Sequence, residues 1–293
     1  MPLLKLSGCK VNLLLNILGK REDGFHELET LMHPVAIFDT LTFSTSREGL
    51  ELTCSEPSLP IDSRNLVHRA AEAFVKAAGV NEGIRIHLEK KIPMAAGLGG
   101  GSGNAATTLL GLNELFGNPL DAEALSSIAA SLGSDIPFFL QGKPAIGIGR
   151  GEQIESLDFF PALKNAAFLL IYPGFGISTA WAYQSLGKFP AALNGSPGRA
   201  RDLLATLNHS TPNVLKGRLY NSLEAPALDK YPILALFQEF LLAQGATAAL
   251  MSGSGSTTFA ICEDLEAAER LATKFKAKFG PSCWVSAVAA APS

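Results

Sequence analysis

The chain has 293 residues, 47% hydrophobic and 17% charged, which supplies enough apolar material for a sizeable core and is long for one typical domain. The 24 basic and 27 acidic residues leave a net charge of −3, and no run rich in Lys or Arg stands out. This excludes an electrostatic surface for nucleic acid or an anionic membrane. We therefore expect a small-molecule partner.

The cysteines indicate the compartment. The four of them lie far apart and form no C-x-x-C pair, which argues against a zinc site or a disulfide framework and favours a reducing environment. Asn12 and Asn16 interrupt the amino-terminal apolar run, which argues against a signal peptide. No segment approaches the roughly 20 apolar residues of a membrane span. We expect a cytoplasmic protein, or one in the equivalent organelle compartment, acting as a monomer or homodimer.

The first half of the chain opens with β-structure. Hydrophobic alternation and turn residues predict strands over residues 3–18, 26–33, 40–44, 49–54 and 84–88. A helix is expected after Asn65, its N-cap, and should stop at Gly79. Two more helices are expected, one over residues 105–116 and one opened by Asp121. The order is strands, helix, strand, glycine loop, helix, helix.

The second half begins near residue 150, where a turn at 147–152 precedes a strand at 167–172. We expect two domains, 1–150 and 151–293. After the boundary, helices are expected over residues 179–186, 199–207, 233–244 and 265–279, and strands over residues 247–251, 257–262 and 284–288. This is an α+β sandwich pattern and not a doubly wound sheet.

A glycine-rich run, Gly97-Leu-Gly-Gly-Gly-Ser-Gly103, lies directly before the helix at 105–116. Such a run exposes backbone N–H groups without obstruction by Cβ atoms, and the following helix adds the positive end of its dipole. A polyphosphate is the expected ligand, because a flexible linker seldom runs straight into an amphipathic helix.

Two other nucleotide motifs fit less well. A Walker loop needs Lys followed by Ser or Thr after its last glycine, and here Asn104 follows. A dinucleotide fingerprint can be placed on Gly101, Gly103 and Ala106 with Asp121 downstream, but its glycines should follow directly on a strand. A nicotinamide enzyme remains the weaker alternative.

These residues resemble the GHMP kinases, whose central motif is a proline followed by Gly-Leu-Gly and small residues, as in the segment from Pro93 to Ala106. The family's late glycine/serine turn is similar to residues 251–256, and its amino-terminal motif to residues 9–13. The resemblance implies a two-lobed α+β fold. Its N-terminal lobe is β-rich with S5-like βαβ character, its C-terminal lobe is a ferredoxin-like sandwich, and the active site lies in the cleft between them.

Within the family, the chain resembles members that act on a cytidine diphosphate ester. The resemblance rests on the segment from Lys10 to His26 and on residues 64–66 and 133–139. It implies ATP and Mg²⁺ as cofactors and phosphorylation of the 2-hydroxyl of the methylerythritol ester. A GHMP kinase for mevalonate, a sugar or homoserine, and a non-catalytic GHMP-fold binding protein, remain open.

Three departures from the family pattern affect the loop and the substrate platform. Ala95 and Ala96 stand where glycines are common, and Gly103 stands where a second serine is common. Phe25 replaces a common tyrosine, which keeps the stacking face and loses a hydrogen bond.

Two residues are expected to be catalytic. Asp135 lies between a small-residue turn and an apolar segment, where its carboxylate would be partly desolvated; the resemblance implies that it is the general base, although a turn aspartate is the plain alternative. Lys10 lies on an apolar strand, so a buried partner is implied unless it points outward from an edge strand. The resemblance suggests that this partner is Asp135.

The other expected site residues follow from the motifs and the resemblance. Ser102 is also the expected magnesium ligand. Expected to bind ATP are Asn65, Pro93, Gly97, Leu98, Gly99, Gly100, Gly101, Ser102, Gly103 and Asn104. Expected to bind the acceptor substrate are Asn12, Phe25, His26, Tyr183, Gly253 and Ser254.

Overall fold

The computed structural model describes residues 2–193, 195–209 and 215–291. They form two compact units, each assembled from separate stretches of chain. The first unit comprises Met1–Cys9, Ile37–Ile92 and Gly99–Gly142. The second comprises Lys10–Ala36, Pro93–Leu98 and Lys143–Ser293. The predicted division into 1–150 and 151–293 stays a prediction.

Two long strands pass through both units. They are β1 (Leu3–Lys20) and β2 (His26–Ser46). The sequence predicted two strands where β2 is continuous. Between the two predicted strands lies Pro34, which lacks an N–H donor, and β2 accommodates it between the stretch that pairs with β5 and the stretch that pairs with β4.

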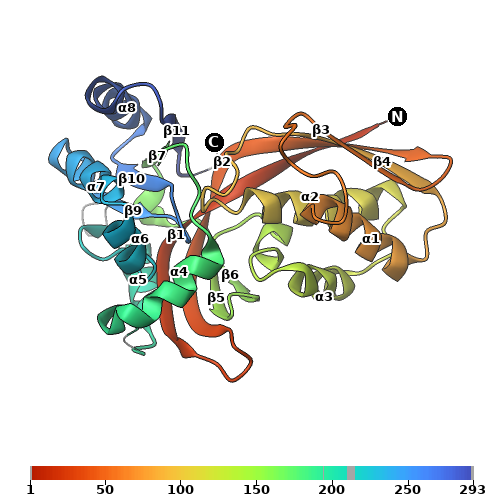
Figure 1. Ribbon diagram of the computed structural model, residues 1–293, viewed down its shortest axis with the longest axis horizontal. Coiled ribbons are helices and arrows are strands. Elements are labelled where there is room, and N and C mark those ends of the chain that lie inside the picture. Colours follow the sequence, from red (N-terminus) through yellow and green to blue (C-terminus); the bar gives the residue numbers. More distant parts are fainter. Residues whose placement is uncertain (1, 194, 210–214, 292–293) are drawn as a thin grey trace. The chain divides into compact units, whose positions relative to one another are not determined.

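In the first unit, three helices cover one face of a sheet (Figure 1). The sheet joins β2 to β4 (Gly83–Glu89) and β4 to β3 (Leu50–Cys54). The apolar residues of β4 are buried and its polar residues are exposed, as the alternation predicted. The helices are α1 (Leu66–Ala78), α2 (Gly100–Leu115) and α3 (Ala122–Leu132), followed by the short η1 (Pro137–Leu140).

Side-chain caps begin two of these helices where the sequence predicted them. Asn65 accepts a hydrogen bond of 2.9 Å from Val67 N at the start of α1, and Asp121 accepts one of 2.8 Å from Ala124 N at the start of α3. Gly79 ends α1 with a left-handed φ of 64°. Helix α2 differs from the prediction, because it begins at Gly100 instead of residue 105. Most of the glycine run is therefore the first turn of a helix.

In the second unit, β1 pairs in parallel with β8 (Tyr220–Asn221), and β2 pairs with the hairpin of β5 (Ala145–Gly149) and β6 (Gln153–Ser156). The sequence predicts only a turn at this hairpin, because glycines dominate residues 147–151. A separate antiparallel sheet has the order β11-β7-β10-β9. Its strands are β7 (Ala167–Tyr172), β9 (Ala248–Met251), β10 (Thr258–Cys262) and β11 (Trp284–Ala289).

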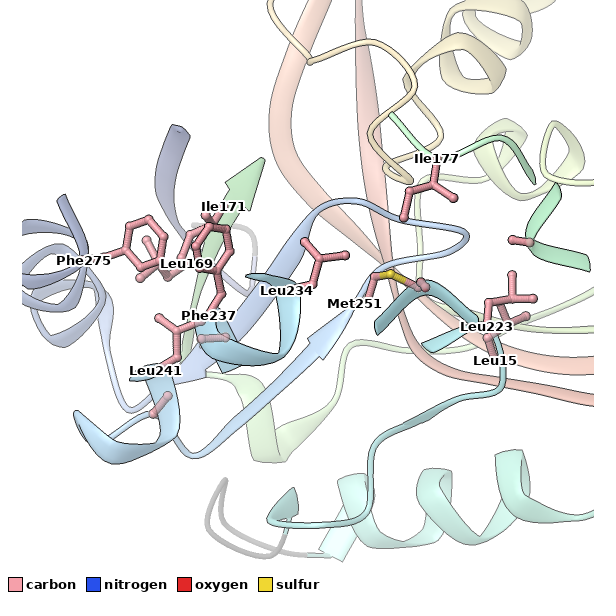
Figure 2. Close-up of a cluster of buried hydrophobic side chains, with 14 of the residues drawn as sticks. Leu15, Leu169, Ile171, Ile177, Leu223, Leu234, Phe237, Leu241, Met251 and Phe275 are labelled. Carbon is pink, nitrogen blue, oxygen red and sulfur yellow. The ribbon is translucent and has the colours of Figure 1, made fainter. Parts of the chain in front are cut away.

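Helices complete the core of the second unit. Figure 2 shows part of this core, in which aromatic and aliphatic side chains of α7, α8 and the sheet interlock around Phe237. The helices are α4 (Thr179–Ser185), α5 (Arg199–His209), α6 (Glu224–Lys230), α7 (Ile233–Ala243) and α8 (Leu265–Phe279). Short 3₁₀ turns lie at η2 (Pro161–Leu163), η3 (Leu186–Lys188) and η4 (Pro190–Ala192). The α+β expectation is confirmed, although α6 was missed.

Within the described ranges, no helix has the length and apolar composition that crossing a membrane requires.

Candidate active site

The start of α2 is an open helix end. Its N-cap, Gly99, adopts a left-handed φ of 70° and supplies no side-chain cap. The first intrahelical bond is donated by Gly103 N to Gly99 O over 2.9 Å, so the N–H groups of Gly100, Gly101 and Ser102 have no partner within the helix. Three amides at the positive end of a helix dipole form a site suited to an anion.

Glycine is needed at different positions of this turn for two different physical reasons. A Cβ atom at Gly103 would lie 2.4 Å from Gly8 O, and one at Gly100 would lie 2.9 Å from Ile92 Cγ2, so a side chain at either position would force its neighbour to shift. At Gly101 the nearest atom would be Leu66 Cδ1, 3.8 Å away. Gly101 is exposed, so its lack of a side chain leaves the backbone approachable.

The position of α2 also excludes the dinucleotide fingerprint. In that motif the glycines follow directly on a strand. Here β4 ends at Glu89, and residues 90–99 separate it from α2.

The segment before α2 lies in the second unit and uses its backbone for packing. Gly97 O accepts a 2.9 Å hydrogen bond from Ser252 Oγ, and Leu98 O accepts one of 2.9 Å from Lys10 N. A Cβ atom at Gly97 would lie 2.2 Å from Ser252 O. Ala95 has a φ of 52°, a conformation that favours glycine. The departure from the family at this position therefore falls where the backbone itself prefers glycine.

Lys10 and Asn12 form a buried polar group on β1. Lys10 is 3% exposed, which excludes the outward-pointing alternative, and its Nζ donates to Asn12 Oδ1. Asn12 Nδ2 donates to Thr30 Oγ1 over 2.8 Å, and Thr30 Oγ1 donates to Leu14 O over 2.6 Å. These bonds fix the side chain of Asn12, which in turn holds the ammonium group of Lys10.

The glycine/serine turn lies against this group. A Cβ atom at Gly253 would be 3.4 Å from Lys10 Nζ and 3.5 Å from Asn12 Oδ1. The structure therefore brings Lys10, Asn12 and Gly253, three of the predicted site residues, into direct proximity. Ser254 Oγ is 2.9 Å from Thr179 Oγ1 at the start of α4.

Two residues that were not predicted from the sequence, the buried Asn221 and the half-buried Glu224, hold this turn. Asn221 Nδ2 donates to Met251 O and to Gly253 O, both over 2.8 Å. Glu224 Oε1 accepts from Met251 N over 2.7 Å and from Gln238 Nε2. Burial raises the pKa of Glu224 to about 7, against the opposing effect of these hydrogen bonds. No short motif marks either residue, because their partners lie in distant segments.

The predicted aromatic platform is partly assembled. The rings of His26 and Tyr183 are tilted by 43° with centroids 5.1 Å apart. Burial, with a smaller contribution from Lys20, lowers the pKa of His26, which favours the neutral form of its ring. Phe25 is 52% exposed, and the guanidinium carbon of Arg150 lies 4.6 Å from the centroid of its ring.

In the first unit, two predicted ATP-binding residues have structural hydrogen bonds. Asn65 caps α1 and donates from Nδ2 to Pro60 O over 2.7 Å. Asn104 is 2% exposed, and both ends of its amide are bonded to buried side chains. Asp135 is half-buried in the turn between α3 and η1.

The metal expectation rests on Ser102 alone. No group of three or more His, Cys, Asp or Glu in the described part of the chain lies together as a metal site. Magnesium in phosphoryl-transfer sites is commonly held by one or two protein oxygens, substrate phosphates and water. The half-buried hydroxyl of Ser102, beside the open amides, fits that pattern.

Comparisons with known proteins place this geometry in a family. Residues 65–143 match the family description GHMP kinases N terminal domain, and residues 180–281 match GHMP kinases C terminal. The chain is 40% identical over 281 residues to 4-diphosphocytidyl-2-C-methyl-D-erythritol kinase of Synechococcus sp. (strain JA-2-3B'a(2-13)), covering 94% of this chain and 89% of the relative. It is 39% identical over 272 residues to the same-named protein of Geobacter sp. (strain M21), covering 92% and 93%.

Solved structures agree with these matches. A crystal structure of 4-(cytidine 5'-diphospho)-2C-methyl-D-erythritol kinase superimposes with a TM-score of 0.81 at 35% identity, covering 98% of this chain and 99% of the other. Homoserine kinase from Cytophaga hutchinsonii has a TM-score of 0.77 at 20% identity, covering 98% and 94%, and shares the fold.

Proposed function

The chain belongs to the GHMP kinases, and from this premise we propose that it transfers the γ-phosphoryl group of ATP to the 2-hydroxyl of 4-(cytidine 5'-diphospho)-2-C-methyl-D-erythritol. It is an ATP-dependent small-molecule kinase, as its family membership establishes. The observation that carries the choice of acceptor is the identity of about 40% to relatives named for that substrate, over 94% of the chain. The reaction would supply the non-mevalonate route to isoprenoid precursors.

The open end of α2 supports the donor half of the reaction. The N–H groups of Gly100, Gly101 and Ser102 would bind phosphate oxygens of ATP, where a negative charge is favoured by the helix dipole. Ser102 would hold Mg²⁺ through its hydroxyl, and the metal would neutralise charge on the phosphates. Gly97 and Leu98 would act through backbone packing, because their carbonyls are bonded within the fold.

The acceptor half rests on the buried group of β1 and the aromatic pair. His26 and Tyr183 would bind the cytosine, with a neutral imidazole available to donate or accept one hydrogen bond. Asn12 and the turn at Gly253 and Ser254 would orient the substrate beside Lys10. Phe25 would extend the platform if Arg150 moves from its ring.

The chemical step requires one proton transfer. As the 2-hydroxyl oxygen bonds to the γ-phosphorus, the bond to the β,γ-bridging oxygen breaks and ADP leaves. The hydroxyl proton would pass to the carboxylate of Asp135, and the ammonium of Lys10 would stabilise the charge that develops on the attacking oxygen. The depth of Lys10 in the fold strengthens this electrostatic contribution.

The remaining expectations stay predictions. We propose a cytoplasmic enzyme on the basis of the cysteine spacing, and a small-molecule substrate without nucleic acid on the basis of the charge balance. A monomer or homodimer is the expected state.

The acceptor assignment can be tested with purified protein, ATP and Mg²⁺. We expect turnover of the cytidyl ester and none of mevalonate or homoserine. Turnover of another acceptor without turnover of the cytidyl ester would overturn the substrate and retain the kinase class.

The assigned roles can be tested with matched variants. Asp135→Ala should lower kcat by about 10² to 10⁴, the usual contribution of a general base. Lys10→Met, which keeps the apolar stem, should lower it comparably. Asp158→Ala and Lys5→Ala change exposed and half-exposed charges and should leave kcat unchanged. Normal turnover with a native melting temperature in either test variant would remove that residue from the mechanism.

A further inference from the structure

Asp39 is a fully buried carboxylate with hydrogen bonds to both of its oxygens. Oδ1 accepts from Lys91 N over 2.7 Å and from Ile92 N over 2.9 Å. Oδ2 accepts from Lys90 Nζ and, over 2.9 Å, from Asn104 Nδ2. A buried charge is tolerated only when it is fully partnered, so this arrangement holds its four donors closely.

The donors come from the two segments that flank the glycine run. Lys90, Lys91 and Ile92 immediately precede Pro93, and Asn104 immediately follows Gly103. The two sides are also bonded to each other, because Lys90 Nζ donates to Asn104 Oδ1 over 3.1 Å. The chain leaves the first unit after Ile92 and returns to it at Gly99. The carboxylate of Asp39 therefore connects the segment before this excursion to Asn104 in α2, just after it.

The first of these segments lies against the open end of α2. A Cβ atom at Gly100 would be 2.9 Å from Ile92 Cγ2 and 3.5 Å from Lys90 Nζ. Residues 90–92 therefore leave no room for a side chain at Gly100, and we expect a displacement of this segment to displace Gly100 and its amide.

We propose that Asp39 is a positioning residue for ATP, which fixes the first-turn amides of α2 where they bind the phosphates. The inference rests on the proposed function. It also assigns Asn104 to this anchor, since both ends of its amide are used within it. A carboxylate is required because an amide at position 39 would present a donor to Lys90 and Asn104, which are themselves donors.

The test compares three variants. Asp39→Asn keeps the size of the side chain and the acceptor for Lys91 and Ile92. The exchange variant combines Asp39→Asn with Asn104→Asp and so places the carboxylate at position 104 instead of position 39. Lys90, which contacts both positions, again faces a negative charge. The control, Asn113→Leu, removes a buried side chain that binds Leu120 N and O, both over 3.0 Å, near the other end of α2.

ADP binding with Mg²⁺, measured by calorimetry, and steady-state kinetics give the readouts. We expect Asp39→Asn to raise the Kd for ADP and the KM for ATP at least tenfold, with kcat and the KM for the acceptor within threefold of wild type. The exchange variant should recover ADP binding to within threefold. The control should lower the melting temperature without changing the KM for ATP.

The outcomes distinguish a failure of this inference from a failure of the proposed function on which it rests. A wild-type protein that binds no ADP would overturn the proposed function together with the inference. Wild-type binding with an unchanged Asp39→Asn variant would overturn the inference alone. A folded exchange variant that binds ADP weakly would do the same, which keeps the test decisive if Asp39→Asn does not fold.

Discussion

The first turn of α2 and the turn at residues 252–256 are both rich in glycine and serine, but they need glycine for different reasons. A Cβ atom at Gly101 would meet no atom closer than 3.8 Å, whereas one at Gly253 would lie 2.9 Å from Gly97 O. Gly253 also has a left-handed φ of 56°. Glycine leaves the backbone approachable in the first case and allows two backbone segments to pack in the second.

The hydrogen bonds differ in the same way. No side chain caps α2, while the turn is bound by Asn221 at two carbonyls and, through Met251 N, by Glu224. Composition alone therefore does not distinguish a glycine that serves a ligand from one that serves the fold. The distinction requires knowing what surrounds the missing side chain.

The comparison predicts that a side chain at Gly253, in the turn at residues 252–256, would cause a large loss of stability. Gly253→Ala should lower the free energy of unfolding by about 3 to 4 kcal/mol, because alanine would be strained at this φ and its methyl would overlap Gly97 O. Urea denaturation measures the change. Gly187→Ala is the matched control, since a Cβ atom there would meet nothing within 4 Å. Equal stability of the two variants would contradict the packing role of Gly253.

A second prediction concerns the ionisation of Glu224, which binds the start of the same turn. Its pKa is about 7 in the folded protein, against 4.5 for an unperturbed glutamate, so the folded state holds more protons between these values. The stabilising contribution of the neutral group is complete below pH 4.5 and is lost as the pH rises through 7. Glu224→Gln keeps a neutral acceptor at every pH.

The variant should therefore gain stability relative to wild type as the pH increases. Between pH 5 and pH 8 the difference in unfolding free energy should move by about 2 to 3 kcal/mol in favour of Glu224→Gln. Parallel urea titrations of both proteins cancel the contributions of the other carboxylates. A difference that does not vary with pH would show that Glu224 is ionised throughout.

Much of the fold could be predicted because its signals are local. The alternation of β4 and the caps at Asn65 and Asp121 involve residues no more than three positions apart. The sequence also predicts that the glycine run is a nucleotide motif, and this stays a prediction. Its helical start was not predicted, because glycine has a poor helix propensity and the packing that favours it here comes from Gly8 and Ile92.

The supporting residues could not be predicted because their roles depend on distant partners. Asp39 binds a side chain 65 positions away, and Asn221 binds a carbonyl 32 positions away. In the sequence, neither residue lies within a predicted helix or strand or in a motif. Tertiary structure alone shows that both are buried and that their hydrogen bonds end at the predicted motifs.

The smallest predicted effect on stability concerns Gly101, in the first turn of α2. Gly101→Ala has space for its methyl group and replaces a poor helix former, so it should stabilise the fold by about 0.5 to 1 kcal/mol. The same methyl group would stand among the amides that we propose to bind phosphate, and it should raise the KM for ATP about tenfold, equivalent to about 1.4 kcal/mol. Thermal unfolding and initial rates at varied ATP measure the two effects, which act in opposite directions.

Asp121→Ala provides the converse control, because it removes the cap of α3 and should cost about 1 kcal/mol of stability without changing the KM for ATP. A Gly101→Ala variant that is more stable and binds ATP normally would mean that the start of α2 is merely an uncapped helix end. A variant that is more stable and binds ATP poorly would show that the fold gives up stability at this turn to keep its amides accessible.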